Sequence, residues 1–318
     1  MINVQLDRVT VVGSFKQASA EKLGEYLRPI GWQDMSFDWE HGIVDGYVLK
    51  RLLNGDDTET VAVIVKNQYQ TTWRLDTSNH FVTNDEKSKV LKALALFENR
   101  HLSRIDIAFD FINMENSGMK HRFVKPNVTV SEIKGESLWI RGRNGKLQTL
   151  YAGKRKSLSL FRYYDKIAEQ KRHRKEILEG IVSWERLELQ VRAERTTEWL
   201  LNSRAMLSYF KMPQEYNLGP KDRAMLMALN NGAVAYSELA KATAAKYRKL
   251  AKNNLGFDDS WAKKAYEILC KKQVDLQMEI NSFLSLIKYS EQKLRFCIIF
   301  PIQNLNFCFL RYKNCYFF

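Results

Sequence analysis

The sequence predicts an α+β protein in which a sheet domain precedes a helical region. Segments of alternating apolar and polar residues, typical of half-buried strands, recur to about residue 195 and are interrupted by single helix-like segments. After Asn217-Leu-Gly-Pro220 the composition shifts to Ala, Leu, Lys and Glu at helical spacing. We therefore expect a sheet domain over residues 1–200 and a helical region over residues 220–295.

The same patterns predict the individual elements. Strands are expected at 7–12, 60–65, 103–111, 138–141, 148–151, 158–166 and 183–191, and helices at 19–27, 85–99, 165–178, 237–252 and 260–288. Asn144-Gly145 lies between two of the strands and is typical of a type I′ hairpin turn.

The last segment, residues 296–318, differs from the rest of the chain. It holds three of the four cysteines and six of the 17 phenylalanines, and it has no acidic residue. Polar residues interrupt its apolar runs well short of the roughly 20 residues that a membrane span needs. An AT-rich stretch read out of frame would encode such a mixture, so we interpret this tail as altered or truncated.

Positive charge is concentrated in one part of the chain. The formal net charge of the 318 residues is +14, and residues 141–176 contribute 12 Lys and Arg against three acids, or +9. This concentration favours a polyanionic partner, with nucleic acid as the leading candidate. A polybasic membrane-binding surface is the alternative, but these residues form no amphipathic helix with an apolar face.

The N-terminal segment bears on the cellular compartment, and the cysteines bear on possible disulfides and zinc sites. Residues 1–8 lack the charged and apolar regions of a signal peptide, which predicts a cytoplasmic protein. The cysteines, at positions 270, 297, 308 and 315, form no C-x-x-C pair and have no histidines at zinc-site spacing. Neither a disulfide framework nor a zinc site is therefore expected.

One predicted strand carries a tyrosine between two cations. Alternation over residues 158–166 places Arg162, Tyr164 and Lys166 on one face. A phenol with a pKa of about 10 is a poor nucleophile at neutral pH, so an attacking tyrosinate is expected where cations lie beside an anionic substrate such as a phosphodiester. The alternative is a half-buried strand whose basic side chains reach solvent.

Two further strands carry acids on a polar face. Alternation gives Asp106 and Asp110 one face of the strand at 103–111, and Glu188 a polar face of the strand at 183–191. Asp106 and Asp110 lie about 13 Å apart along an extended strand, too far to bind one ion together. We expect Asp106 and Glu188 to form a metal site beside Tyr164, with Asp110 as a substitute ligand or as a group that orients the ligands. The alternative is a set of ion pairs between these acids and Arg104, Arg162 and Arg186.

Basic and aromatic residues near Tyr164 are candidates for DNA contacts. The basic candidates are Lys154, Arg155, Lys156, Lys171, Arg172, Arg174 and Lys175. Trp184 and Tyr151 are candidates for stacking on a base, with a place in the core as the alternative for each. The run from Lys246 to Lys252 fits either duplex phosphates or a solvated helix face.

Four motifs in this order resemble plasmid rolling-circle replication initiators of the replication initiation factor type, which are related to relaxases of conjugative elements. They are Ser-Arg-Ile-Asp-Ile-Ala-Phe-Asp (103–110), Tyr-Ala-Gly-Lys-Arg-Lys-Ser (151–157), Phe-Arg-Tyr-Tyr-Asp-Lys (161–166) and Trp-Glu-Arg-Leu-Glu-Leu-Gln (184–190). The resemblance covers roughly residues 1–200. It implies an antiparallel-sheet nicking domain like the rolling-circle initiator fold.

The resemblance also implies a reaction. Tyr164 would nick one strand at a plasmid origin, single-stranded or extruded, leaving a 5′-phosphotyrosyl link and a 3′-hydroxyl for a host polymerase, with a host helicase as a further partner. Tyr163 lies on the opposite face by alternation. The wider superfamily holds its metal with a His-x-His pair that this chain lacks, so carboxylates would bind Mg²⁺ or Mn²⁺.

Other functions fit the same residues. A relaxase of a mobile element would use the same chemistry on a different origin, whereas a repressor would bind DNA without chemistry and would have no need of Tyr164. The sequence leaves open whether the protein acts as a homodimer.

Overall fold

The computed structural model describes residues 1–15, 22–35, 43–53, 57–67, 72–78, 81–123, 138–141, 147–154, 156–173, 175–213, 218–230, 233–254 and 257–284. The strands are β1 (Ile2–Phe15), β2 (Trp32–Asp34), β3 (Ile43–Leu52), β4 (Thr58–Asn67), β5 (Trp73–Thr77), β6 (Phe97–Ile112), β7 (Arg122–Phe123), β8 (Leu138–Arg141), β9 (Leu147–Ala152), β10 (Ser159–Asp165), β11 (Trp184–Arg192), β12 (Phe210–Pro213) and β13 (Phe257–Asp258). The helices are α2 (Leu23–Leu27), α3 (Asn84–Leu94), α4 (Lys166–Arg172), α5 (Trp199–Tyr209), α6 (Pro220–Asn230), α7 (Lys241–Asn254) and α8 (Ser260–Ser282), with 3-10 turns η1 (Arg28–Ile30), η2 (Ala193–Glu198) and η3 (Tyr236–Glu238).

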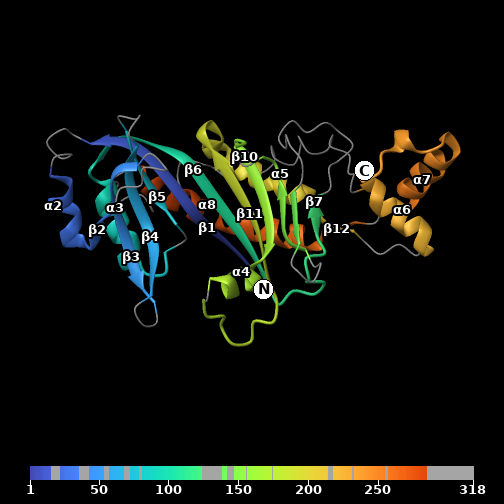
Figure 1. Ribbon diagram of the computed structural model, residues 1–318, viewed down its shortest axis with the longest axis horizontal. Helices are drawn as coiled ribbons and strands as arrows, with labels where there is room; N and C mark the ends of the chain where they lie inside the picture. The colour runs from blue at the N-terminus through green and yellow to red at the C-terminus, as the bar shows by residue number, and fades with distance from the viewer. Residues whose placement is uncertain are drawn as a thin grey trace.

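An antiparallel sheet dominates the molecule (Figure 1). Across the described residues it has ten strands in the order β2-β3-β4-β5-β1-β6-β11-β10-β9-β8. The N-terminal strand β1 lies inside the sheet between β5 and β6. The α+β class and the antiparallel sheet predicted from the sequence are confirmed.

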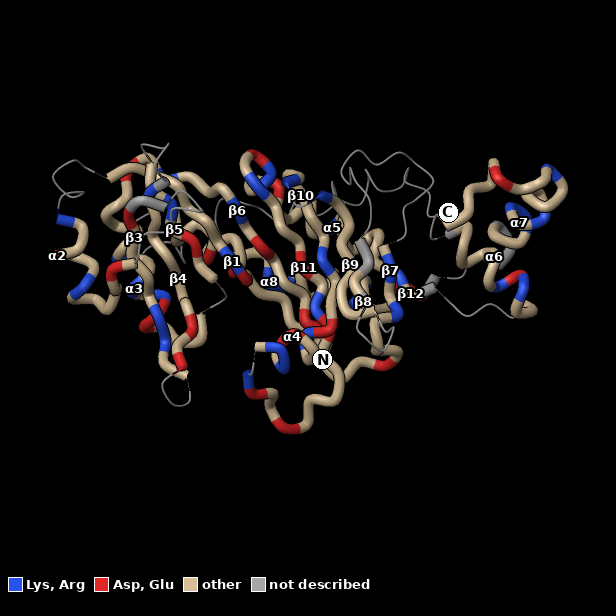
Figure 2. Tube along the Cα trace, in the orientation of Figure 1, with Lys and Arg blue, Asp and Glu red and all other residues tan. Residues whose placement is uncertain are grey.

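The three central strands β6, β11 and β10 each have an apolar and a polar face. The apolar face carries Ile105, Ile107 and Phe109 of β6, all fully buried, as their alternation predicts. The opposite face carries acids and arginines in neighbouring positions, which Figure 2 shows as red and blue segments along these strands. The sheet therefore turns one face to the core and gathers charge on the other.

Helix α8 covers the apolar face, behind the strands in Figure 1. Trp261 at its start stacks on Phe111 of β6, with ring centroids 4.7 Å apart, and is 3% exposed. Further along, Lys272 donates hydrogen bonds to the side-chain oxygen of Asn3 (2.7 Å) and the carbonyl of Val4 (3.0 Å). The helix thus completes the core of the sheet although it is far from most of the strands in sequence.

Helices α6 and α7 have a small core of their own. Leu226 and Leu229 of α6 pack against Tyr247 and Ala251 of α7. The region 220–295, which the sequence suggests as one helical unit, therefore contains a helix pair with its own core and a helix that packs on the sheet. In the described part of the chain no helix combines the length and the apolar character of a membrane span.

Some predicted elements have different ends in the structure. The helix expected over 85–99 ends at Leu94, because Phe97 begins β6 and buries its ring in the core. The basic helix expected over 165–178 ends at Arg172, since the chain there leaves the helix and turns at Gly180, where φ is +81°. The Asn144-Gly145 turn and the tail at 296–318 lie outside the described residues.

Truncating Trp261 should separate α8 from the sheet. The Trp261→Ala substitution leaves a cavity against Phe111 and should lower the free energy of unfolding by about 3–5 kcal/mol. Urea denaturation measures this loss. The control Val274→Ala changes an exposed position of the same helix and should alter stability by less than about 0.5 kcal/mol. Equal effects of the two substitutions would contradict the packing of α8 described above.

Candidate functional site

Tyr164 occupies the polar face near the end of β10. It lies opposite Arg186 on β11 and Thr149 on β9. The guanidinium carbon of Arg162 lies 4.5 Å from the centre of its ring, and the Lys166 ammonium lies 5.7 Å from it. The structure thus brings together the three residues that alternation placed on one face, although Lys166 already belongs to α4.

The hydroxyl of Tyr164 is poorly prepared to ionise in the DNA-free protein. Burial raises the pKa of Tyr164 well above its ordinary value, and the charge of Glu188 raises it further, against the opposing effects of Arg186 and Arg162. Among the described residues, none hydrogen-bonds to this hydroxyl. Burial therefore outweighs the flanking cations in the free protein, and an attacking tyrosinate beside a bound phosphodiester stays a prediction.

Tyr163 points to the other face, as predicted. It is fully buried, and its hydroxyl donates a hydrogen bond to Glu185. The same carboxylate accepts a hydrogen bond from the backbone of Met119 at 3.0 Å. Tyr163 is therefore part of the core, and Tyr164 is the tyrosine of this pair on the charged face.

Asp106 and Glu188 come together on neighbouring strands. Glu188 lies opposite Ala108 of β6, so Asp106 is its diagonal neighbour on the same face. Burial raises the pKa of Asp106 to about 6, with the Arg104 hydrogen bond opposing the shift and the charge of Glu188 adding to it. Asp106 and Glu188 thus form a pair of close acids, as the sequence suggests.

Each of these acids is paired with an arginine. Arg104 forms two hydrogen bonds to Asp106, one of 2.7 Å through Nε. Arg162 donates to one oxygen of Glu188 through Nε, at 3.0 Å, and through Nη2. The ion pairing that the sequence offered as an alternative is therefore present in the structure.

Asp110 holds Arg186, as the alternative of arginine–carboxylate pairs predicts. Arg186 donates to Asp110 through Nε and Nη2, at 2.7 and 2.9 Å, and to Asp7 through Nη1 at 2.7 Å. Trp184 also donates to Asp110, at 2.7 Å, so this indole is engaged within the face. Arg186 is itself buried, with 4% of its side chain exposed.

Sequence reasoning missed Asp7 and the central position of Arg186. The pairing of β1 with β6 shifts register between Leu6 and Arg8, so Asp7 is the extra residue of a bulge. The bulge turns its carboxylate to Arg186 on β11. An acid at the start of a predicted strand was the only signal, and it did not indicate a bulge.

The acids fit a divalent metal that prefers oxygen ligands, but only in part. Within the described ranges no three His, Cys, Asp or Glu side chains are gathered to hold a metal. Mg²⁺ is commonly bound by one or two carboxylates completed by water and substrate phosphates. Asp106 and Glu188 are the two acids that would supply such a pair, and each is paired with an arginine in the structure.

Four of the candidate DNA-binding residues lie at the two ends of β10. Lys154 and Lys156 are exposed in the turn before β10, and Lys171 and Arg172 are exposed on α4 beyond its end. Lys175 forms an ion pair with Glu59 of β4. Arg155 and Arg174 lie outside the described residues.

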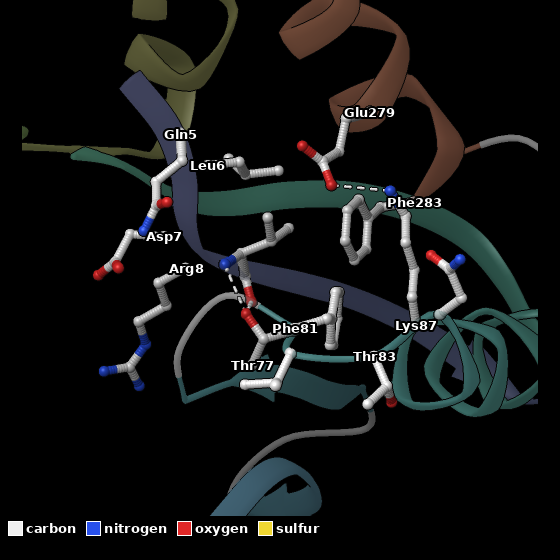
Figure 3. Close-up of a pocket in the computed structure, with 13 residues that line it drawn as sticks. Gln5, Leu6, Asp7, Arg8, Thr77, Phe81, Thr83, Lys87, Glu279 and Phe283 are labelled. Carbon is white, nitrogen blue, oxygen red and sulfur yellow. Dashed lines mark hydrogen bonds and ion pairs between the residues drawn. The ribbon is translucent and has the colours of Figure 1, made fainter. Parts of the chain in front are cut away.

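A pocket of about 230 Å³ lies beside β1 (Figure 3). Asp7 and Arg8 line it from the strand, and Lys87 and Glu279, joined by an ion pair, line it from α3 and α8. Its lining does not include Tyr164. The pocket adjoins the charged face through Asp7, the partner of Arg186, and through Arg8, which lies opposite Asp106 of β6.

The raised pKa of Asp106 predicts a pH-dependent stability. An acid whose pKa is higher in the folded protein than in the unfolded chain favours folding below the unfolded pKa of about 4, and this contribution is lost as the pH rises to about 6. Asp106→Asn removes the titration. Relative to wild type, the variant should therefore gain on the order of 2 kcal/mol in the free energy of unfolding between about pH 4 and pH 7.

Urea denaturation at the two pH values measures this gain. Asp34→Asn, at an exposed ion pair with Arg28, is the control and should show a much smaller change. A difference between wild type and Asp106→Asn that stays constant with pH would contradict the raised pKa.

Comparisons with known proteins bear on the region that carries these residues. Residues 100–218 match a family model described as replication initiation factor. No curated protein sequence matches the chain. The solved structure of a rolling circle replication initiator protein from Geobacillus stearothermophilus is 13% identical and covers 69% of this chain and 90% of its own, with a TM-score of 0.41. The four motifs all fall within residues 100–218, and over this range the chain matches the replication initiation factor family, which confirms the resemblance that the motifs predict.

Proposed function

We propose that this protein initiates rolling-circle replication by nicking one strand of a plasmid origin with Tyr164. The observation that supports this most is the placement of Tyr164 beside Arg162 and Lys166 on the same sheet face as Asp106 and Glu188. The family match points to replication rather than to conjugative transfer. Such an enzyme would act in the cytoplasm with a host helicase and polymerase.

The proposed reaction exchanges one phosphodiester for another. The Tyr164 oxygen attacks the scissile phosphorus, and its phenolic proton passes to a water molecule. A bond forms between the tyrosine oxygen and the phosphorus, and the bond from phosphorus to the 3′ oxygen breaks. The 3′ oxygen takes up a proton and becomes the primer, while the 5′ end stays linked to the tyrosine. Arg162 and Lys166 stabilise the charge that develops on the phosphate oxygens.

Tyr164 must lose its proton in a site that disfavours the loss. In the free protein Glu188 raises the pKa of Tyr164, whereas Arg162 and Arg186 lower it. Neutralising the charge of Glu188 would therefore help the phenol to ionise. A divalent ion such as Mg²⁺ or Mn²⁺, bound by Asp106 and Glu188, would supply that neutralisation and polarise the scissile phosphate.

The basic residues at the two ends of β10 would hold the single strand across the charged face. Their separation, about 20 Å along a seven-residue strand, matches several nucleotides of an extended strand. Tyr151 lies opposite Arg162 on β9 and is half-buried, so it remains the candidate for stacking on a base.

We further propose that the α6–α7 pair binds duplex DNA at the origin. Helix α7 contains lysines and one arginine but no acid. Lys246 is paired with Asp222 of α6, whereas Lys241 and Lys249 are exposed and have no acidic partner within the described residues. These two lysines are therefore available to contact the phosphates of duplex DNA.

Replacing Tyr164 tests the nucleophile. Tyr164→Phe should abolish a covalent adduct between the protein and supercoiled DNA carrying the candidate origin, because no other group on the face would attack, while DNA binding persists. Denaturing gels with Mg²⁺ or with EDTA measure the adduct, which should require the metal in wild type.

Tyr163→Phe is the matched control. It should still form the adduct, although the loss of the hydrogen bond to Glu185 should lower the free energy of unfolding by about 1–3 kcal/mol. An adduct that survives Tyr164→Phe and disappears in Tyr163→Phe would overturn the assignment. If wild type binds the origin and forms no adduct, the repressor function becomes the better explanation.

Replacing the two available lysines tests the role of α7. The double variant Lys241→Gln/Lys249→Gln should weaken duplex binding across sequences and reduce the salt dependence by about two phosphate contacts. Fluorescence anisotropy over a salt series measures both. Nicking of a single-stranded origin oligonucleotide should not change, and Lys22→Gln, at an exposed position before α2, should bind duplex as wild type does. An unchanged salt slope would rule out these contacts.

A further inference from the structure

The arginines that pair with Asp106 and Glu188 lie on the solvent side of the two acids. The side chains of Asp106 and Glu188 are 1% and 5% exposed, whereas those of Arg104 and Arg162 are 21% and 35% exposed. Each guanidinium therefore covers a buried carboxylate like a cap. A ligand that approaches the face meets the caps before it meets the acids.

Another arginine of the face, Arg186, is held differently. Arg186 has 4% of its side chain exposed and donates three hydrogen bonds to two acids on two other strands. Its release would leave Asp7 and Asp110 buried without a cation, which costs several kcal/mol in proteins. Arg186 is thus fixed in place, whereas Arg104 and Arg162, the partners of Asp106 and Glu188, are exposed enough to change partners.

We infer that Arg104 and Arg162 exchange partners when DNA binds. Each arginine releases its carboxylate, Asp106 or Glu188, and pairs with a phosphate of the strand. Both carboxylates are then free to bind the metal. Arg104 thereby becomes a DNA-contacting residue in addition to those named above. This inference rests on the proposed function, because it takes the metal and the DNA strand to share this face.

Charge balance supports the exchange. The two acids and two arginines are neutral as a group in the free protein. A divalent ion alone would leave two positive charges in excess, and two phosphates alone would leave two negative charges in excess. Together they restore neutrality, so each ligand lowers the electrostatic cost of binding the other.

The strand order fits two separate phosphate contacts. Arg104 is on β6 and Arg162 on β10, with β11 between them. Arg104 lies opposite Arg192 of β11 and Arg162 lies opposite Glu188, four positions earlier on the same strand. With strands about 4.8 Å apart and about 3.3 Å per residue along them, the two arginines are rooted about 16 Å apart. We assign them to different phosphates of one strand.

The test measures metal and DNA binding without catalysis. Electron paramagnetic resonance reports free Mn²⁺, and fluorescence anisotropy reports binding of a labelled oligothymidylate of about 12 nucleotides, which has a backbone but no origin sequence. In wild type, DNA should tighten Mn²⁺ binding roughly 10-fold, and Mn²⁺ should tighten DNA binding by the same factor.

The cap variants separate this inference from the proposed function. Arg104→Gln and Arg162→Gln should bind Mn²⁺ more tightly than wild type without DNA, because the competing cation is gone, and the coupling between Mn²⁺ and DNA should fall toward 1. Arg28→Gln removes an exposed arginine that is paired with Asp34 elsewhere, and it should keep the wild-type coupling.

Two kinds of result would contradict two different proposals, the exchange of partners and the metal site. Independent binding of Mn²⁺ and DNA to wild type, or full coupling in both cap variants, would refute the exchange and leave the proposed metal site intact. Mn²⁺ binding that is absent, or that is unchanged in Asp106→Asn, would refute the metal site itself and with it the exchange.

Discussion

The buried guanidinium of Arg186 is the constraint on which the charged face depends. It ties β11 to Asp7 on β1 and to Asp110 on β6, so three neighbouring strands are fixed by one side chain. Charge buried on a sheet is tolerated only where opposite charges alternate with good hydrogen-bond geometry. Tyr164 lies directly opposite Arg186, and its position on the face therefore follows from this cluster.

The sequence was sufficient to predict which face of each central strand is buried. A period of two, with large apolar residues such as Ile107 and Leu189 at alternate positions, determines which side of a strand is buried. The same rule correctly separated Tyr163 from Tyr164 and put Asp106 and Glu188 on one surface. These inferences need only local alternation, and local alternation is encoded by neighbouring residues.

Features that depend on distant segments could not be read in the same way. The bulge at Asp7 is defined by pairing with β6, about 100 residues later, and nothing near Asp7 indicates it. The place of α8 on the sheet is likewise decided by partners such as Phe111. The burial of the Tyr164 ring, which raises the pKa of its hydroxyl, also depends on distant segments, because a strand pattern shows neighbouring charges and does not show how deeply the ring is buried.

Because Tyr163 and Tyr164 are adjacent, the register of β10 decides which of the two rings lies in the core and which lies on the charged face. A slip of β10 by one residue would exchange the two rings between core and face. Gly153, in the turn before β10 with φ of +103°, helps to set that register, because a Cβ there would lie 3.0 Å from the carbonyl oxygen of Ser159. A slipped chain would lose the buried hydrogen bond of Tyr163 and would turn Arg162 into the core. Copies with the slipped register would thus be less stable than the native fold.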